Sequence, residues 1–238
     1  MARVRAVVAA SPPPGGLAAL LRSPPLHPSP ARAEGETILD SRFRALVGDT
    51  AWVQLPPAVR RRFSKRLAPG DVALYRGAVI ETTLSRTGRV LAMLGRLIGA
   101  PLPLTDGATG PAIVAVTEDA AIGGQIWTRS YARPGRFHQV VHSAKRFRGP
   151  TGLEEYVGCG IGMTLTVGVE AGALVFRSSR YFLEFGRLRL TLPRWLEPGA
   201  MEIVHREEDA GGRFSFRLTL RHRAFGCLVH QLAMFEDA

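Results

Sequence analysis

The sequence contains only two cysteines, Cys159 and Cys227, and neither lies in a CxxC or Cys/His spacing. Two cysteines are too few for a disulfide framework. We therefore interpret both as small buried residues in a reducing compartment and expect a cytoplasmic protein. No apolar run reaches the ~18 residues that a membrane-spanning helix needs, so no such helix is expected.

Lysine is also scarce, because Lys65 and Lys145 are the only lysines among 31 basic residues, and the formal net charge is +11. This skew toward arginine can follow from codon composition as easily as from selection for phosphate binding. The arginines are scattered through alternating segments whose outward positions are polar in any case. We interpret them as a solvated basic surface and expect no nucleic-acid partner. Peripheral contact with an anionic membrane is the alternative.

Proline, glycine, alanine and serine dominate the first part of the chain. Such a composition supports neither a helix nor a strand ladder, so we predict a disordered tail over residues 1–38. The remainder has a suitable length for one compact unit. We predict a single β-rich domain over residues 39–238.

Helices are predicted only in the N-terminal third. Residues 41–47 precede a glycine and predict a short helix. A second helix begins near a Pro-Pro pair and places Val59, Phe63 and Leu67 on one face. Residues 87–98 are apolar around most of the helical circumference, which predicts a helix buried on several sides.

The C-terminal two thirds alternate between apolar and polar residues, with Gly/Pro turns at regular intervals. Phe214, Phe216, Leu218 and Leu220, for example, are separated by polar residues, as in a half-buried strand. No helix-length segment separates the strands, so parallel βαβ units are not supported. We predict an α+β fold, mainly antiparallel β: a large curved or barrel-like sheet with two to three helices from the N-terminal third.

Three glycines, Gly158, Gly160 and Gly162, recur at every second residue. In a strand they would leave one face bare, so that a helix, a backbone or a ligand could lie against it. The apolar helix over 87–98 is one candidate for that contact. A dinucleotide fingerprint is rejected, because Met163 occupies the position of its third glycine and the following residues resemble a strand.

Candidate catalytic groups are few. Glu154 and Glu155 are adjacent, so on a strand they face opposite ways, and we expect one exposed acid and one inward acid. Glu154 could act with His138 or His205 as an acid–base pair in an apolar cavity. His138 and His142 would lie ~13 Å apart on a strand, too far to share an ion. We predict no metal site and no cofactor.

A ligand-binding row is better supported by the pattern. Trp127, Arg129 and Tyr131 share one face of a predicted strand, which suits a ligand with a polar or anionic head and an apolar body. The alternative is a surface arginine that lies between two packing aromatic rings. We predict that the row lines a site together with three further residues: Tyr181, Leu94 and Ile98.

Several segments resemble the bacterial domain of unknown function numbered 4166, over residues 55–235. Their order and spacing carry the resemblance, although no single segment is specific. They include LPPAVRR at 55–61, RVLAMLGRLIGAPLP at 89–103, QIWTRSY at 125–131, GLEEYVG at 152–158, GRFSF at 212–216 and FGCLVH at 225–230. Similar domains occur alone or behind a nucleotide-binding, reductase-like domain. The resemblance implies an accessory or substrate-handling module and supplies no catalytic residue.

Our leading hypothesis is a non-catalytic module that binds an apolar or amphipathic small molecule, for which a lipid-like compound is one candidate. An enzyme that uses the Glu/His pair and a docking domain for a separate nucleotide-dependent reductase are the alternatives. Arg129 and Glu154 distinguish the binding module from the enzyme. The binding hypothesis assigns ligand capture to Arg129, whereas the enzyme hypothesis assigns turnover to Glu154.

Overall fold

The computed structural model describes residues 40–99, 101–119, 121–133, 135–209 and 212–237. The described residues belong to the compact unit Ile38–Ala238. The predicted tail, 1–38, lies outside them.

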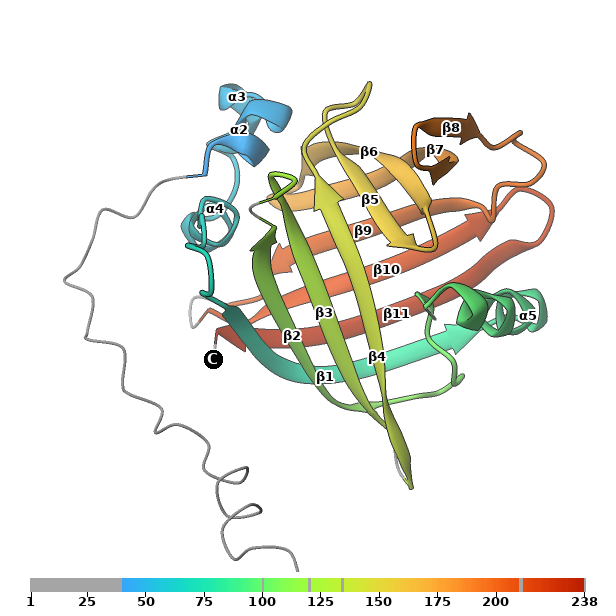
Figure 1. Cartoon of the computed structure of the whole chain (residues 1–238). Helices are drawn as coiled ribbons and strands as arrows, with labels where there is room; N and C mark the ends of the chain where they lie inside the picture. The colour runs from blue at the N-terminus through green and yellow to red at the C-terminus, as the bar shows by residue number, and fades with distance from the viewer. Residues whose placement is uncertain (1–39, 100, 120, 134, 210–211, 238) are drawn as a thin grey trace, which may run out of the picture. The chain divides into compact units, whose positions relative to one another are not determined.

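Ten antiparallel strands of this unit form a closed barrel (Figure 1). The order around the ring is β6-β5-β4-β3-β2-β1-β11-β10-β9-β7, and pairing of β6 with β7 closes it. The predicted antiparallel sheet is confirmed, and it closes. The barrel strands are β1 (Ala73–Leu84), β2 (Gly110–Asp119), β3 (Gly124–Arg133), β4 (Arg136–Arg146), β5 (Glu154–Gly158), β6 (Ile161–Glu170), β7 (Ala173–Phe185), β9 (Ala200–Glu207), β10 (Phe214–His222) and β11 (Gly226–Asp237).

Strand β7 changes its partner part-way along its length. Residues 174–177 pair with β9, whereas residues 182–185 pair with the short strand β8 (Leu188–Thr191). The second half of β7 therefore leaves the β9 ladder.

Four α-helices lie in the described residues, whereas two to three were predicted: α2 (Arg42–Val47), α3 (Asp49–Trp52), α4 (Pro57–Phe63) and α5 (Arg86–Gly95). A 3-10 turn, η1 (Arg96–Ile98), continues α5. Helix α4 begins at the Pro-Pro pair, as predicted, but it ends at Phe63. Leu67 therefore lies outside the helix, and only Val59 and Phe63 of the three predicted residues form its apolar face.

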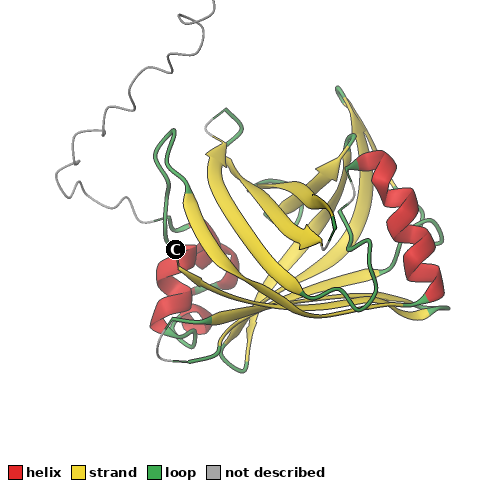
Figure 2. Cartoon of the chain, turned by 90° about the horizontal axis from the view of Figure 1, so that it is seen from below, coloured by secondary structure: helices red, strands yellow, loops and turns green. Residues whose placement is uncertain are grey.

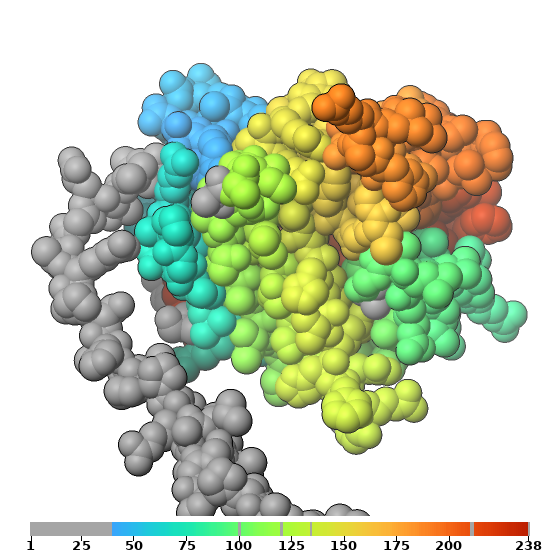
Figure 3. Space-filling model, in the orientation of Figure 1, coloured from blue at the N-terminus to red at the C-terminus, as the bar shows by residue number. Residues whose placement is uncertain are grey.

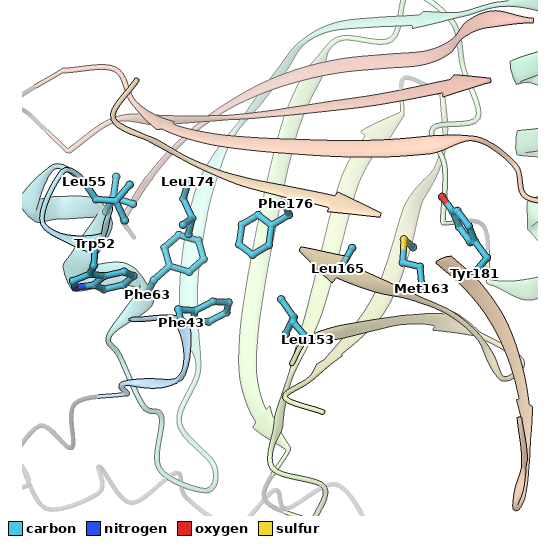
Figure 4. Close-up of a cluster of buried hydrophobic side chains, with 11 residues drawn as sticks. Phe43, Trp52, Leu55, Phe63, Leu153, Met163, Leu165, Leu174, Phe176 and Tyr181 are labelled. Carbon is cyan, nitrogen blue, oxygen red and sulfur yellow. The ribbon is translucent and has the colours of Figure 1, made fainter. Parts of the chain in front are cut away.

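Helices α2 to α4 lie together at one end of the barrel, and α5 lies at the other end (Figure 2). The first three helices insert aromatic side chains into the ring of strands (Figure 4). Phe43 is fully buried, and its ring meets those of Phe63 and Phe176 edge to face, with centroids 5.1 and 6.1 Å apart. Edge-to-face pairs of this kind stabilise a core beyond the area that they bury. This end of the barrel is therefore plugged.

Helix α5 contacts the barrel through small residues rather than large ones. Gly88, Ala92 and Gly95 are its buried positions, and a Cβ at Gly88 would stand 1.9 Å from the Leu228 carbonyl oxygen. Most large apolar residues face outward instead, such as Met93 of the helix and Leu97 of η1, which is 81% exposed, whereas Leu91 is partly buried against the barrel. The prediction of a helix buried on several sides is wrong, because the backbone of α5 approaches β11 too closely to admit large side chains.

The glycine run does not form one face of one strand, as predicted, because the chain turns within it. Strand β5 ends at Gly158, and Cys159 and Gly160 adopt positive φ angles of 48° and 74° in the turn to β6. A backbone does lie against the first glycine: a Cβ at Gly158 would stand 2.0 Å from the Ile98 carbonyl oxygen. The expected contact with the apolar helix therefore comes from its C-terminal end.

This close approach predicts a large difference between two glycines of the same hairpin. Gly158 combines a φ of 135° with the Ile98 contact, whereas Gly168 has open space around its Cβ position. We expect Gly158→Ala to lower the free energy of unfolding by about 2–4 kcal/mol. Gly168→Ala should change it by less than about 0.5 kcal/mol. Urea denaturation of both variants measures the difference, and equal midpoints would contradict the packing described here.

Candidate functional site: a cavity inside the barrel

A cavity of about 360 Å³ occupies the part of the barrel that the helices do not plug. Its volume lies within the range of roughly 300–1,000 Å³ that is usual for small-molecule sites. Apolar side chains form most of its wall, from Phe63 and Phe176 on the plugged side to Leu91 and Ile98 near α5. The space-filling view shows a hollow between α5 and the yellow strands (Figure 3).

Two loop segments add further apolar lining to the cavity. Leu196 and Pro198 come from the segment between β8 and β9, and Pro101 and Pro103 come from the segment after η1. Next to Leu196 in the sequence, Trp195 is 78% exposed. Both segments therefore extend the apolar wall.

The predicted row lies on the cavity wall. Trp127, Arg129 and Tyr131 all face the interior from β3, and Tyr181 and Ile98 line the same space. Burial raises the pKa of the Tyr181 phenol to about 12, although a hydrogen bond with Ser178 opposes this rise.

Leu94 is the exception among the predicted site residues. It lies on the outer face of α5 and is 59% exposed, outside the cavity. Its neighbour in the helix sequence, Gly95, lines the cavity instead. The prediction failed here because it took the whole apolar helix as the contact, whereas only one side of the helix faces inward.

Sequence reasoning missed a polar group on the cavity wall next to Arg129. Lys145 from β4 places its Nζ 3.1 Å from Oε1 of Glu155 on β5, and Arg129 Nη2 lies 3.7 Å from the same oxygen. Arg129 Nη1 also donates a hydrogen bond to Ser143 Oγ at 3.0 Å. These four side chains form the polar corner of an otherwise largely apolar cavity.

Burial and charge act in opposite directions in the polar corner. Burial lowers the pKa of the Lys145 ammonium, and the neighbouring Glu155 carboxylate only partly opposes this effect. Burial raises the pKa of Glu155, but the charges of Lys145 and Arg129 outweigh it, and the net pKa lies below its ordinary value. Glu155 is therefore a carboxylate at neutral pH.

Aromatic rings complete the surroundings of Lys145. Its Nζ lies 4.9 Å from the ring centre of Trp127 and 5.8 Å from that of Phe176. The negative faces of aromatic rings stabilise a cation that has lost its water. The lysine is therefore held by one carboxylate and two rings.

A signal for this pair existed in the sequence. Lys145 and Glu155 are equidistant from Pro150, the centre of the turn between two predicted strands, and the structure pairs them directly across β4 and β5. Opposite charges at such cross-strand positions stabilise a sheet. The alternation of Glu154 and Glu155 along one strand does not contain this signal, because the partner lies on the neighbouring strand.

Glu154, the candidate acid, lies on the other face of β5 and does not line the cavity. It is completely buried, because Arg189 Nη2 approaches Oε1 at 2.6 Å and Arg148 Nε donates to Oε2 at 3.2 Å. The expected opposite orientation of Glu154 and Glu155 is therefore observed. The expectation that one acid is exposed is wrong, because the two arginines cover Glu154.

The sheet register separates Glu154 from His205. Through β6, Glu154 lies opposite Arg180 of β7, whereas His205 lies opposite Leu174 of the same strand. These β7 positions are six residues apart, which corresponds to about 20 Å. The two side chains cannot exchange a proton directly.

His138 is also distant from Glu154. On β4, Glu154 pairs with Arg146, eight residues from His138, which corresponds to about 26 Å. His138 is exposed, and its Nδ1 lies 3.3 Å from Ser130 Oγ. The predicted acid–base pair is therefore assembled with neither histidine.

His205 belongs to the plugged end of the barrel. It is fully buried, with ring centroids 5.1 Å from Phe63, 4.9 Å from Phe214 and 4.6 Å from Phe216. Burial, assisted by the charge of Arg62, lowers the pKa of His205 to about 3. The imidazole is neutral in the folded protein at physiological pH.

The remaining candidates lie apart from the cavity. Cys159 and Cys227 are exposed free thiols, so the expectation that they are buried is wrong. Across the described ranges, no three His, Cys, Asp or Glu side chains gather in a way that could hold a metal ion. In the same residues, no helix is long and apolar enough to cross a membrane.

The fold and the cavity define a closed antiparallel β-barrel that is plugged at one end and hollow at the other. The chain belongs to the family described as Domain of unknown function (DUF4166), whose model matches residues 55–235. The match includes every strand of the barrel up to Phe235. No curated protein and no solved structure matches the chain significantly.

His205 makes the stability of the protein depend on pH. Folded His205 stays neutral down to about pH 3, whereas an unfolded imidazole binds a proton below about pH 6.5. Unfolding therefore takes up a proton between these values, and acidification across this window lowers the free energy of unfolding by up to about 1.4 kcal/mol per pH unit.

We expect His205→Phe to remove this part of the pH dependence, since a phenylalanine ring suits the aromatic surroundings and does not titrate. Denaturant unfolding at pH 7, 6, 5 and 4 measures the slope. His138→Phe, at an exposed position, is the control and should retain the wild-type slope. Parallel curves for the wild type and His205→Phe would contradict the buried neutral state.

Proposed function

We propose that this protein is a non-catalytic binding module that holds an apolar or amphipathic small molecule inside its barrel. The observation that carries the proposal is the cavity of about 360 Å³, with apolar walls and one polar corner. This arrangement matches the general composition of small-molecule sites, in which a few polar groups orient a ligand that apolar walls bury.

The apolar wall favours an occupant of low polarity. The cavity is open to solvent, so either water or a ligand fills it. Water fills apolar space poorly, because it needs two to four polar partners. A ligand with an apolar body has no such requirement.

The loop segments support the same proposal. Leu196, Pro198, Pro101 and Pro103 add apolar lining that the apolar body of a ligand can contact. Two further roles stay predictions from the family resemblance: docking to a separate reductase-like protein, and an accessory role.

Neighbouring residues of β4 provide a matched test. Val141 lines the cavity and is 4% exposed, whereas Val140 points outward and is 44% exposed. We expect Val141→Phe to weaken binding of the fluorescent apolar probe 1-anilinonaphthalene-8-sulfonate by about tenfold, because the larger ring occupies ligand space.

Val140→Phe adds the same ring outside the barrel and should bind the probe like the wild type. Thermal unfolding of both variants establishes that each is folded, since overpacking at Val141 could cost about 1–3 kcal/mol. Equal probe affinities for the two folded variants would contradict binding inside the barrel.

A further inference from the structure

The polar corner carries an unbalanced charge. The charged side chains in the described lining of the cavity are Arg129, Lys145 and Glu155, which together give a net charge of +1. Lys145 and Glu155 are each at most 4% exposed, and Arg129 is 19% exposed. A buried charge without a partner is costly, so this corner favours the arrival of one negative charge.

Glu155 is a single carboxylate that Lys145 and Arg129 share, so it neutralises only one of the two positive charges. Lys145 and Arg129 approach the same oxygen, Oε1, at 3.1 and 3.7 Å. The shorter contact belongs to Lys145, and the longer one lies beyond hydrogen-bonding distance. Arg129 Nη1 donates a hydrogen bond to Ser143 Oγ. Nη2 can therefore donate a hydrogen bond to a ligand.

Glu155 also limits how much negative charge can be accepted. Its second oxygen, Oε2, is buried and has no hydrogen-bond partner. A carboxylate oxygen without a partner repels further negative charge in a low-dielectric space, and the repulsion grows with the charge of the ligand group. The corner is thus suited to a monoanion rather than to a dianion such as a phosphate monoester.

We propose that the polar corner is a head-group subsite for the carboxylate of an amphipathic acid, bound by Arg129 and Lys145. The acid's apolar body lies along the aromatic and aliphatic wall from Trp127 toward Leu91 and Ile98. This inference rests on the proposed function, because it names the ligand class that the cavity takes. A planar guanidinium matches the two oxygens of a carboxylate, and charge-assisted hydrogen bonds of this kind are about twice as strong as neutral ones.

The test uses four probes that share one tail: dodecanoate, dodecanol, dodecylammonium and dodecyl phosphate. We expect isothermal titration calorimetry at pH 7 to give dodecanoate a dissociation constant at least about tenfold below those of the other three. Arg129→Gln should reduce the preference for dodecanoate over dodecanol to less than about threefold, mainly by weakening the binding of dodecanoate. Arg129→Lys keeps the charge and should retain part of the preference.

The outcomes separate this inference from the proposed function. If dodecanol binds as tightly as dodecanoate, or if Arg129→Gln leaves the preference intact, the carboxylate subsite is wrong while the binding cavity stands. Tightest binding of dodecylammonium or dodecyl phosphate would also overturn it. If none of the four probes binds, both the subsite and the proposed function are overturned. Thermal unfolding of each variant establishes that a lost preference does not come from a lost fold.

Discussion

Closing ten antiparallel strands into one ring fixes the width of the barrel, and the rest of the structure depends on that width. About eight strands already enclose a space that side chains just fill, and the diameter grows with strand number. A ten-stranded ring therefore needs additional material inside. Helices α2 to α4 supply it at one end with Phe43, Trp52 and Phe63. The other end keeps the cavity.

The same constraint explains why the interior charges are informative. A wide, apolar lumen excludes most water, so any charge on its wall must find partners within the protein or in a ligand. Glu154 on the outer face satisfies this requirement with two arginines, whereas Arg129 on the inner face lacks a close carboxylate of its own. The proposed function and the proposed head group both follow from this difference between the two faces of one sheet.

Alternation along the strands was sufficient to predict the antiparallel sheet and the shared inward face of Trp127, Arg129 and Tyr131, because a strand has a period of two. Closure of the ring and the partners of Glu154 depend on contacts far apart in the sequence, which one-strand patterns do not contain. Helix α5 misled the prediction because its apolar surface normally indicates burial. The structure buries its small residues, such as Gly88, and leaves Leu94 and Leu97 exposed.

The measurement that tests the central claim most directly is native mass spectrometry of the full chain, gently purified from its own host and followed by solvent extraction. We expect the 25.8 kDa chain to carry one stoichiometric small molecule that is released by the solvent and has an apolar body. The mass of the bare chain, with no compound in the extract, would contradict the account of the barrel as an occupied binding chamber.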